Sequence, residues 1–148
     1  MRRFLPAVAL LLSSGCFSAN SLLPPKLSGE IAMRGPNLGD GTFVPAACQS
    51  GDYERFYGVD LVSADGGTFV RVVEDAIKGP LVRVMTKEMG PAKGVLFSGE
   101  TCAVLKGAFD RTGWRVNGIL DFKGEFELEC KAHSGDEIRG KLSFVHCH

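Results

Sequence analysis

The sequence predicts an all-β domain, either an antiparallel β-sandwich or a squat barrel of about eight or nine short strands. Polar and apolar side chains alternate with period two over residues 114–130, and Asp-Gly, Gly-Gly and Gly-Pro pairs recur between short apolar runs. The 148 residues include 19 Gly and 7 Pro, a composition that favours turns and strands over long helices. A secreted chain of roughly 130 residues can bury about two-thirds of its unfolded surface, enough for one core.

The first two-thirds of the chain supplies six candidate strands. Ala64-Asp65-Gly66-Gly67 is the strongest hairpin signal, because Asp-Gly and Gly-Gly supply the positive φ that tight turns require. A helical turn near Glu74 to Lys78, before Gly79-Pro80, is the sole helix candidate. The expected strands are 29–34, 42–44, 57–63, 68–74, 81–86 and 94–97.

The last third contains the clearest pattern. Segments 102–109 and 114–120 flank Asp110-Arg111-Thr112-Gly113, which predicts a second hairpin turn. Run 114–130 places apolar groups or glycine on its even positions, and its 17 residues exceed a usual strand. A break is therefore expected at Gly118 or Gly124, with Lys123-Gly124 preferred.

A turn over residues 131–137 and an antiparallel strand over 138–147 complete the expected fold. In that last strand Ile138, Leu142 and Phe144 share one face, as the period of two requires. We therefore expect this face to pack into the core.

The amino terminus has the organisation of a secretory signal. Arg2 and Arg3 precede an apolar stretch from Phe4 to Leu12, and a run of small residues follows. The apolar stretch is about half of the ~18 to 20 residues that cross a bilayer. The leader is therefore predicted to direct export without spanning the membrane.

Ser13-Ser14-Gly15-Cys16 resembles the bacterial lipoprotein signal, in which a cysteine after small residues receives diacylglycerol before cleavage. One position departs from that pattern, because Ser13 stands where the family usually has Leu. The alternative is an ordinary signal that is cleaved after Ser18. The resemblance implies a lipid anchor at Cys16 but no activity.

That resemblance divides the chain into a signal peptide over 1–15, a lipid anchor and tether over 16–26, and one β domain over 27–148. Phe17, which follows the cysteine, replaces the Asp that is associated with retention in the inner membrane. The resemblance therefore implies a cell-envelope protein in the outer membrane, facing the periplasm or the surface.

Four cysteines remain after Cys16, an even number that predicts two disulfides in an exported chain. The expected final hairpin would separate Cys130 from Cys147 by ~25 Å, which excludes a bond between them. Cys48 then forms a disulfide with Cys130 or with Cys147, and Cys102 pairs with whichever of these two cysteines remains. We favour Cys48 with Cys130 and Cys102 with Cys147.

The segment GEFELEC, residues 124–130, resembles small lipoprotein antigens of the mycobacterial 19-kDa type, in which a strand ends on a cysteine. The resemblance covers about seven residues and implies no function. It adds only another likeness to a lipoprotein β domain.

Charge and motifs favour a binding or structural role, with an envelope protein or a surface ligand as partner. The 17 basic residues balance 17 acidic ones, which disfavours nucleic acid as a partner. No P-loop, dinucleotide fingerprint or metalloprotease motif occurs in the sequence, and no cofactor is expected. We expect no enzyme activity of a motif-defined class.

The alternative function is a metal-binding or hydrolytic site. His146 and His148 lie two residues apart and would share one strand face, as metal ligands can. Paired carboxylates can act in hydrolysis, and a base, a hydroxyl and a carboxylate occur together in the turn 133–136. The candidate residues are His146, His148, the glutamate row Glu125, Glu127 and Glu129, and the turn residues His133, Ser134 and Asp136.

Overall fold

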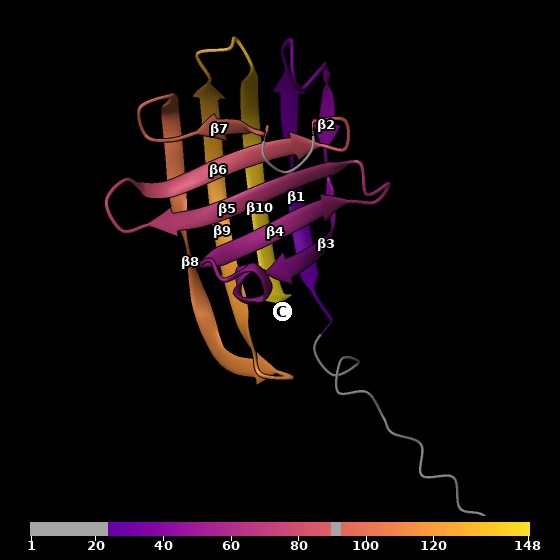
Figure 1. The fold of residues 1–148 in the computed structure, drawn as a ribbon, viewed down its shortest axis with the longest axis vertical. Helices are drawn as coiled ribbons and strands as arrows, with labels where there is room; N and C mark the ends of the chain where they lie inside the picture. Colours follow the sequence, from indigo (N-terminus) through magenta and orange to yellow (C-terminus); the bar gives the residue numbers. More distant parts are fainter. Residues whose placement is uncertain (1–23, 90–92) are drawn as a thin grey trace, which may run out of the picture.

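A computed structural model describes residues 24–89 and 93–148 as two antiparallel five-stranded sheets packed face to face (Figure 1). The expected all-β sandwich is confirmed, with ten strands. Residues 1–23, which contain the predicted signal peptide and Cys16, lie outside the described residues.

The first sheet has the strand order β2-β1-β10-β9-β8, and the second has the order β3-β4-β5-β6-β7. The first sheet contains β1 (Lys26–Arg34), β2 (Gly41–Phe43), β8 (Cys102–Val116), β9 (Ile119–Lys131) and β10 (Glu137–Cys147). The second contains β3 (Pro45–Ser50), β4 (Gly58–Ser63), β5 (Thr68–Asp75), β6 (Gly79–Thr86) and β7 (Val95–Phe97). A single 3-10 turn among the described residues, η2 (Gly51–Glu54), follows β3.

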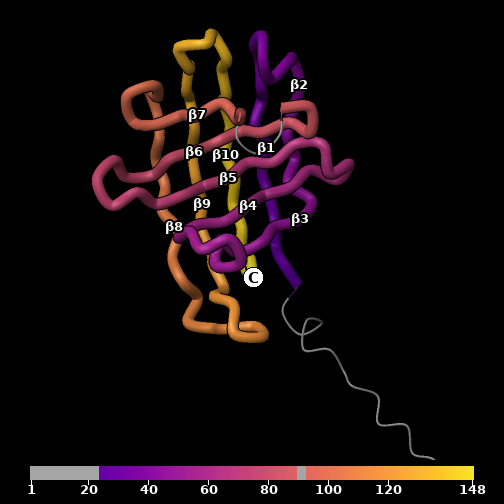
Figure 2. The backbone as a smooth tube through the Cα atoms, in the orientation of Figure 1, coloured from indigo at the N-terminus to yellow at the C-terminus, as the bar shows by residue number. Residues whose placement is uncertain are grey.

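The strands of the second sheet run across those of the first, as both the ribbon and the backbone trace show (Figures 1 and 2). Two sheets that cross steeply overlap only in their middle. The first sheet therefore extends past the second at both ends. The longest extension is the β8–β9 hairpin, at the bottom of both views.

The core lies between the two inner faces, where alternate residues of nearly every strand are buried. Ile138, Leu142 and Phe144 of β10 are at most 2% exposed, which confirms the expected inward face. An aromatic cluster extends the core toward the hairpin, because the Tyr57 ring lies 5.4 Å from Phe109 and 5.2 Å from Phe122. Other fully buried core side chains include Ile31, Phe43, Val59, Leu61, Val70, Val72, Val82, Val84 and Phe97.

The expected turn at 110–113 is wrong, because β8 continues through these residues to Val116. The chain reverses instead at Asn117 and Gly118, whose φ values of 51° and 86° are those of a two-residue hairpin turn. Asn-Gly is the strongest sequence signal for that turn. At 112–114 the strand forms a bulge, seen as the register shift between Arg111 and Arg115.

Of the two breaks expected within 114–130, the one at Gly118 is confirmed by the turn at 117–118, whereas the preferred break at Lys123-Gly124 is wrong. Gly124 lies inside β9, opposite Phe109 on β8 and Phe144 on β10. A Cβ at this position would lie 2.6 Å from Phe109 Cβ and 2.7 Å from Phe144 Cζ. The glycine therefore makes room for two core rings within a continuous strand.

Strand β3 and turn η2 were not expected from the sequence. β3 begins at Pro45 and pairs only with β4, and a proline is tolerated at the start of such an edge strand. The expected helical turn at 74–78 is absent. Asp75 accepts hydrogen bonds from the backbone N–H groups of Ile77 and Lys78, which closes a tight β5–β6 hairpin.

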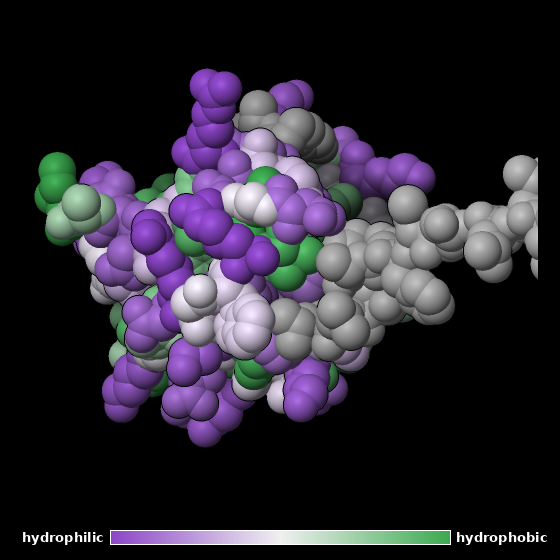
Figure 3. Space-filling view, turned by 90° about the horizontal axis from the view of Figure 1, so that it is seen from below, coloured by the Kyte–Doolittle hydropathy of each residue, from purple (hydrophilic) through white to green (hydrophobic). Residues whose placement is uncertain are grey.

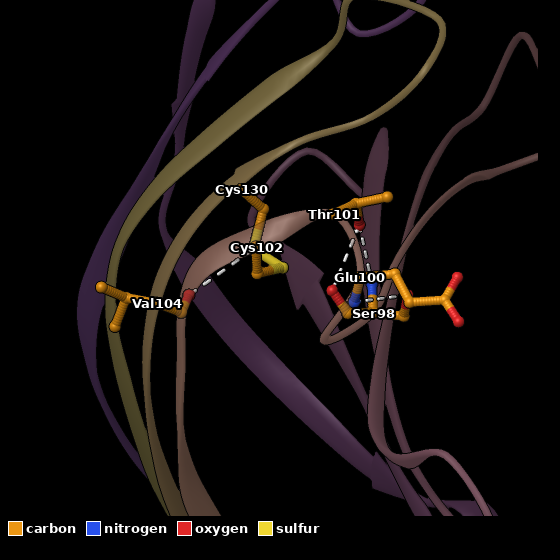
Figure 4. The surroundings of a disulfide bond; sticks show 6 residues. All are labelled: Ser98, Glu100, Thr101, Cys102, Val104 and Cys130. Carbon is orange, nitrogen blue, oxygen red and sulfur yellow. Dashed lines mark hydrogen bonds between the residues drawn. A yellow bond between two sulfur atoms is a disulfide. The ribbon is translucent and has the colours of Figure 1, made fainter.

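The disulfides join Cys48 to Cys147 and Cys102 to Cys130. The excluded pair is not formed, but the favoured pairing is wrong. β8 and β10 flank β9 and run in the same direction, so the start of β8 and the end of β10 lie at opposite ends of the sheet. Cys102 therefore lies opposite Cys130 (Figure 4), and Cys147 ties the first sheet to β3 of the second.

A buried carboxylate, Asp136, holds two turns together at the end of the sandwich opposite the β8–β9 hairpin. Asp136 is 0% exposed and accepts hydrogen bonds from Asn37 N (2.9 Å), Asn37 Nδ2 (2.7 Å), Leu38 N (3.0 Å) and Ser134 Oγ (2.6 Å). These contacts join the β9–β10 turn to the β1–β2 connection. Burial raises the pKa of Asp136, but the hydrogen bonds from Asn37, Ser134 and Leu38 outweigh it and lower that pKa.

Removing the inter-sheet disulfide should destabilise the protein more than removing the one within the first sheet. The Cys48–Cys147 bond closes a sequence separation of 99 residues and Cys102–Cys130 one of 28. Loop-closure entropy then makes C48S/C147S less stable than C102S/C130S by about 1 kcal/mol. Urea unfolding of both variants measures the difference, after non-reducing peptide mapping of the parent. An equal loss, or a larger one in C102S/C130S, contradicts the expectation.

Stability should fall in acid through Asp136. The folded-state pKa of Asp136 lies below the usual 3.8. Its contribution to the free energy of unfolding is therefore complete above pH 3.8 and is lost as the pH drops through 3.8 toward the lowered pKa. The variant Asp136→Asn should be less stable than wild type at pH 7 and should lose less stability between pH 5 and pH 3. Exposed Asp110→Asn is the control and should follow wild type. Parallel acid profiles for wild type and Asp136→Asn would refute this role.

Candidate functional site

The glutamate row lies on the outer face of the first sheet, where Glu125 and Glu127 line an open hollow together with Lys106 and Lys141. Glu125, Glu127 and Glu129 are all exposed, as the alternation predicts. Glu127 lies opposite Lys106 on β8 and Lys141 on β10, and the Lys141 Nζ is 3.4 Å from its carboxylate. Charges of opposite sign thus alternate across the strands, which stabilises a solvated sheet face. These exposed glutamates lack the burial that raises the pKa of a catalytic acid.

The turn 133–136 holds no catalytic arrangement. The Ser134 hydroxyl donates directly to Asp136, whose other contacts are the structural hydrogen bonds described above. His133 is exposed in the same turn. A catalytic triad would place an imidazole between the hydroxyl and the carboxylate.

The two carboxy-terminal histidines, in contrast, converge on one buried carboxylate. His146 Nδ1 lies 3.1 Å from Asp121 Oδ2, and His148 Nδ1 lies 3.5 Å from Asp121 Oδ1. Asp121 is 0% exposed, although it occupies a position that the alternation assigns to the outer face. The two histidines lie together as the sequence predicts, but the sequence analysis did not identify Asp121 as the residue that they contact.

Bulges in both neighbouring strands explain how Asp121 is covered. On one side, β10 shifts register between Val145 and Cys147 and leaves His146 as an extra residue with a φ of 63°. On the other side, β8 bulges at 112–114. Each bulge turns a side chain toward Asp121 that a regular strand would direct elsewhere.

The β8 bulge is attached to the carboxylate through Thr112. Its hydroxyl donates to Asp121 Oδ2 at 2.5 Å and accepts from the backbone N–H of Trp114 at 3.3 Å. Trp114 lies in the bulge and is 63% exposed. Asp121 thus sets the conformation of the segment that presents this indole to solvent.

The cluster joins two imidazoles to one carboxylate. Both imidazoles direct Nδ1 at it, with His146 3.1 Å from Oδ2 and His148 3.5 Å from Oδ1. Asp121 Oδ1 and His148 Nδ1 are 3.5 Å apart, and neither atom has a hydrogen-bond partner in the described part of the chain. In the described ranges, no group of three or more His, Cys, Asp or Glu side chains is placed to hold a metal ion.

Turn η2 closes the same end from the second sheet. Asp52 Oδ2 accepts from the backbone N–H of Leu120 at 3.1 Å and lies 4.0 Å from Arg115 Nη1. Glu54, in the same turn, binds Arg71 of β5 at 2.6 Å. η2 therefore links the hairpin to the outer face of the second sheet.

Arg71 is fully engaged in holding that turn. It donates through Nε and Nη2 to Asp60 at 2.8 and 2.7 Å, and its guanidinium lies 4.3 Å from the centre of the Phe56 ring. The hydrogen bond to Asp60 raises the pKa of Arg71, against the opposing effect of burial and with help from Glu54. Arg71 thus keeps its charge and has a structural role.

We call the β8–β9 segment 111–122, η2 and residues 146–148 the hairpin end. Its outward residues include Tyr53 at 54% and Trp114 at 63% exposure, and the Arg115 side chain is 58% exposed. Figure 3 views the molecule from this end and shows hydrophobic atoms bordered by hydrophilic side chains. Such a mixed surface suits contact with another surface better than it suits a reaction.

Among the residues with a described structure, none belongs to a helix that is long and apolar enough to cross a bilayer. Comparison of the chain with protein-family models, with curated proteins and with solved structures finds no match.

Proposed function

We propose that this chain is a lipid-anchored, disulfide-braced β-sandwich of the cell envelope, with a binding or structural role. The leader and Ser13-Ser14-Gly15-Cys16 support the anchor. The sandwich supports a binding or structural role for two reasons. Its buried charges and ion pairs hold strands and turns together, and its outward side chains form surfaces that suit contact with another molecule.

The use of the cysteines is the observation that carries the proposal. All four cysteines after Cys16 pair with one another, so no thiol of the sandwich remains as a partner for Cys16. Two disulfides in so short a chain are typical of an oxidising compartment such as the periplasm or the cell surface. Cys16 is then the cysteine that is available for lipid.

The start of the sandwich fits a short tether. β1 begins at Lys26, ten residues after Cys16, and ten residues span at most ~35 Å. Two ester-linked chains and one amide-linked chain would hold such a protein at the bilayer, because each buried methylene contributes ~0.8 kcal/mol. The sandwich would then act at the membrane surface, on an envelope protein or a surface ligand.

Metabolic labelling with a fatty-acid analogue tests the anchor. The wild-type chain should be labelled, and Cys16→Ala should lose the label and accumulate as the unprocessed precursor. Cys48→Ala/Cys147→Ala is the matched control, because it removes two cysteines of the sandwich and should keep the label.

Mass spectrometry of the mature amino terminus decides between the two cleavage sites. The proposal requires a lipid-modified Cys16 as the first residue. A mature chain that begins at Ala19 would refute it.

A further inference from the structure

We propose that the hairpin tip, residues 111–120, rests on the membrane that carries the anchor. Trp114 would lie at the level of the lipid headgroups, and Arg111 and Arg115 would bind anionic phosphates. The inference rests on the proposed lipid anchor and adds to it an orientation of the sandwich and a second point of contact.

Strand register places the tip and the tether at the same end of the molecule. Lys26, where β1 begins, is level with Val145 of β10, which is level with Lys123 of β9 and Asp110 of β8. The hairpin continues past this row to its turn at 117–118. Figure 1 shows the start of β1 and the hairpin together at the lower end of the sandwich.

The tether is long enough to allow the contact. From Lys123 to Gly118 the hairpin advances five residues, or roughly 17 Å at the usual rise per strand residue. The ten residues from Phe17 to Lys26 reach at most ~35 Å. A lipidated Cys16 can therefore lie in the plane that the tip touches, without strain in the tether.

The composition of the tip matches a lipid surface. Segment 111–120, RTGWRVNGIL, contains two exposed arginines, no acidic residue and the exposed Trp114, while Val116 and Ile119 are half-buried and Leu120 packs against the core. Tryptophan favours the boundary between water and hydrocarbon, and basic side chains are attracted to anionic lipids. Exposed Lys26 and Lys123 add positive charge at the base of the hairpin, where the exposed Asp110 lies opposite Lys123. Arg115 donates through Nη1 to Gly118 O at 2.7 Å and lies 4.0 Å from Asp52, which leaves its other guanidinium donors for a phosphate.

The tip is presented in a fixed conformation. The bulge at 112–114 is held on Asp121 through Thr112, and Leu120 is held on Asp52. Tyr53, which is 54% exposed on η2, adds a second aromatic side chain to this end. The backbone that carries Trp114 is therefore held in place by hydrogen bonds in the free protein, so the tip needs no folding step to meet a membrane.

Trp114 is the single tryptophan of the chain and reports directly on the contact. The processed protein, purified from membranes, is mixed with vesicles of phosphatidylcholine, with or without phosphatidylglycerol, and with brominated acyl chains as quenchers. With phosphatidylglycerol present, Trp114 emission should shift to shorter wavelength and be quenched at least about twofold. Without the anionic lipid the quenching should be weaker.

Charge variants separate lipid binding from folding. Arg111→Gln/Arg115→Gln should lose most of the quenching, whereas Arg111→Lys/Arg115→Lys should keep it, because the charge is retained. Arg34→Gln/Arg139→Gln removes two arginines near the opposite end of the first sheet and should behave as wild type. Unfolding curves verify that each variant is folded.

Flotation with the vesicles tests the anchor separately. A chain that floats while Trp114 stays unquenched keeps the anchor and overturns the inference. Equal quenching with and without phosphatidylglycerol, or loss of quenching in the lysine variant, also overturns it. A chain that does not float refutes both the anchor and the contact.

Discussion

The hairpin end depends on one interaction, the enclosure of the Asp121 carboxylate by groups from three directions. Thr112 comes from β8, His146 from β10 and His148 from the residue after β10, and the carboxylate itself is 0% exposed. A buried carboxylate is strongly unfavourable unless donors surround it. The two bulges bring the Thr112 hydroxyl and the His146 imidazole within hydrogen-bond distance of Asp121 Oδ2, while His148 Nδ1 lies 3.5 Å from Oδ1 without a hydrogen bond.

The surrounding structure holds this arrangement against its local strain. His146 adopts a left-handed conformation that a residue with a Cβ normally avoids, at a typical cost of about 1–3 kcal/mol. The next residue, Cys147, is fixed by its bond to Cys48 of the other sheet. A covalent tie beside the strained residue keeps the chain end close to Asp121, and with it the β8 bulge that displays Trp114.

The two ends of the first sheet use a buried aspartate in different ways. Asp136 joins two turns into a closed bracket, with donors that are mostly backbone and amide groups. Asp121 is contacted by the Thr112 hydroxyl and two imidazoles, and it supports an end where an indole and an arginine face outward. One end is therefore a structural closure, and the other presents a surface on the side where β1 begins.

Much of this fold follows from local sequence rules. The alternation in 120–130 correctly predicts the buried face of β9, and the glycine-rich turn at 64–67 predicts the β4–β5 hairpin. Asp121 could not be found in this way, because its burial results from bulges in two other strands. The cysteine pairing was missed because the expected break at Lys123-Gly124 adds a chain reversal that β9 does not make. Without that reversal, the start of β8 and Cys147 lie at opposite ends of the sheet.

Hydrogen–deuterium exchange of Asp121→Asn beside Asp110→Asn tests most directly whether this carboxylate organises the hairpin end. Hydrogen bonds to a charged group contribute about 1.5–3 kcal/mol, so exchange through local opening should quicken roughly tenfold to a hundredfold at 111–120 and 144–148. The second sheet and the Asp110→Asn control should exchange as wild type does. Unchanged protection of the tip in Asp121→Asn would contradict the role assigned to Asp121.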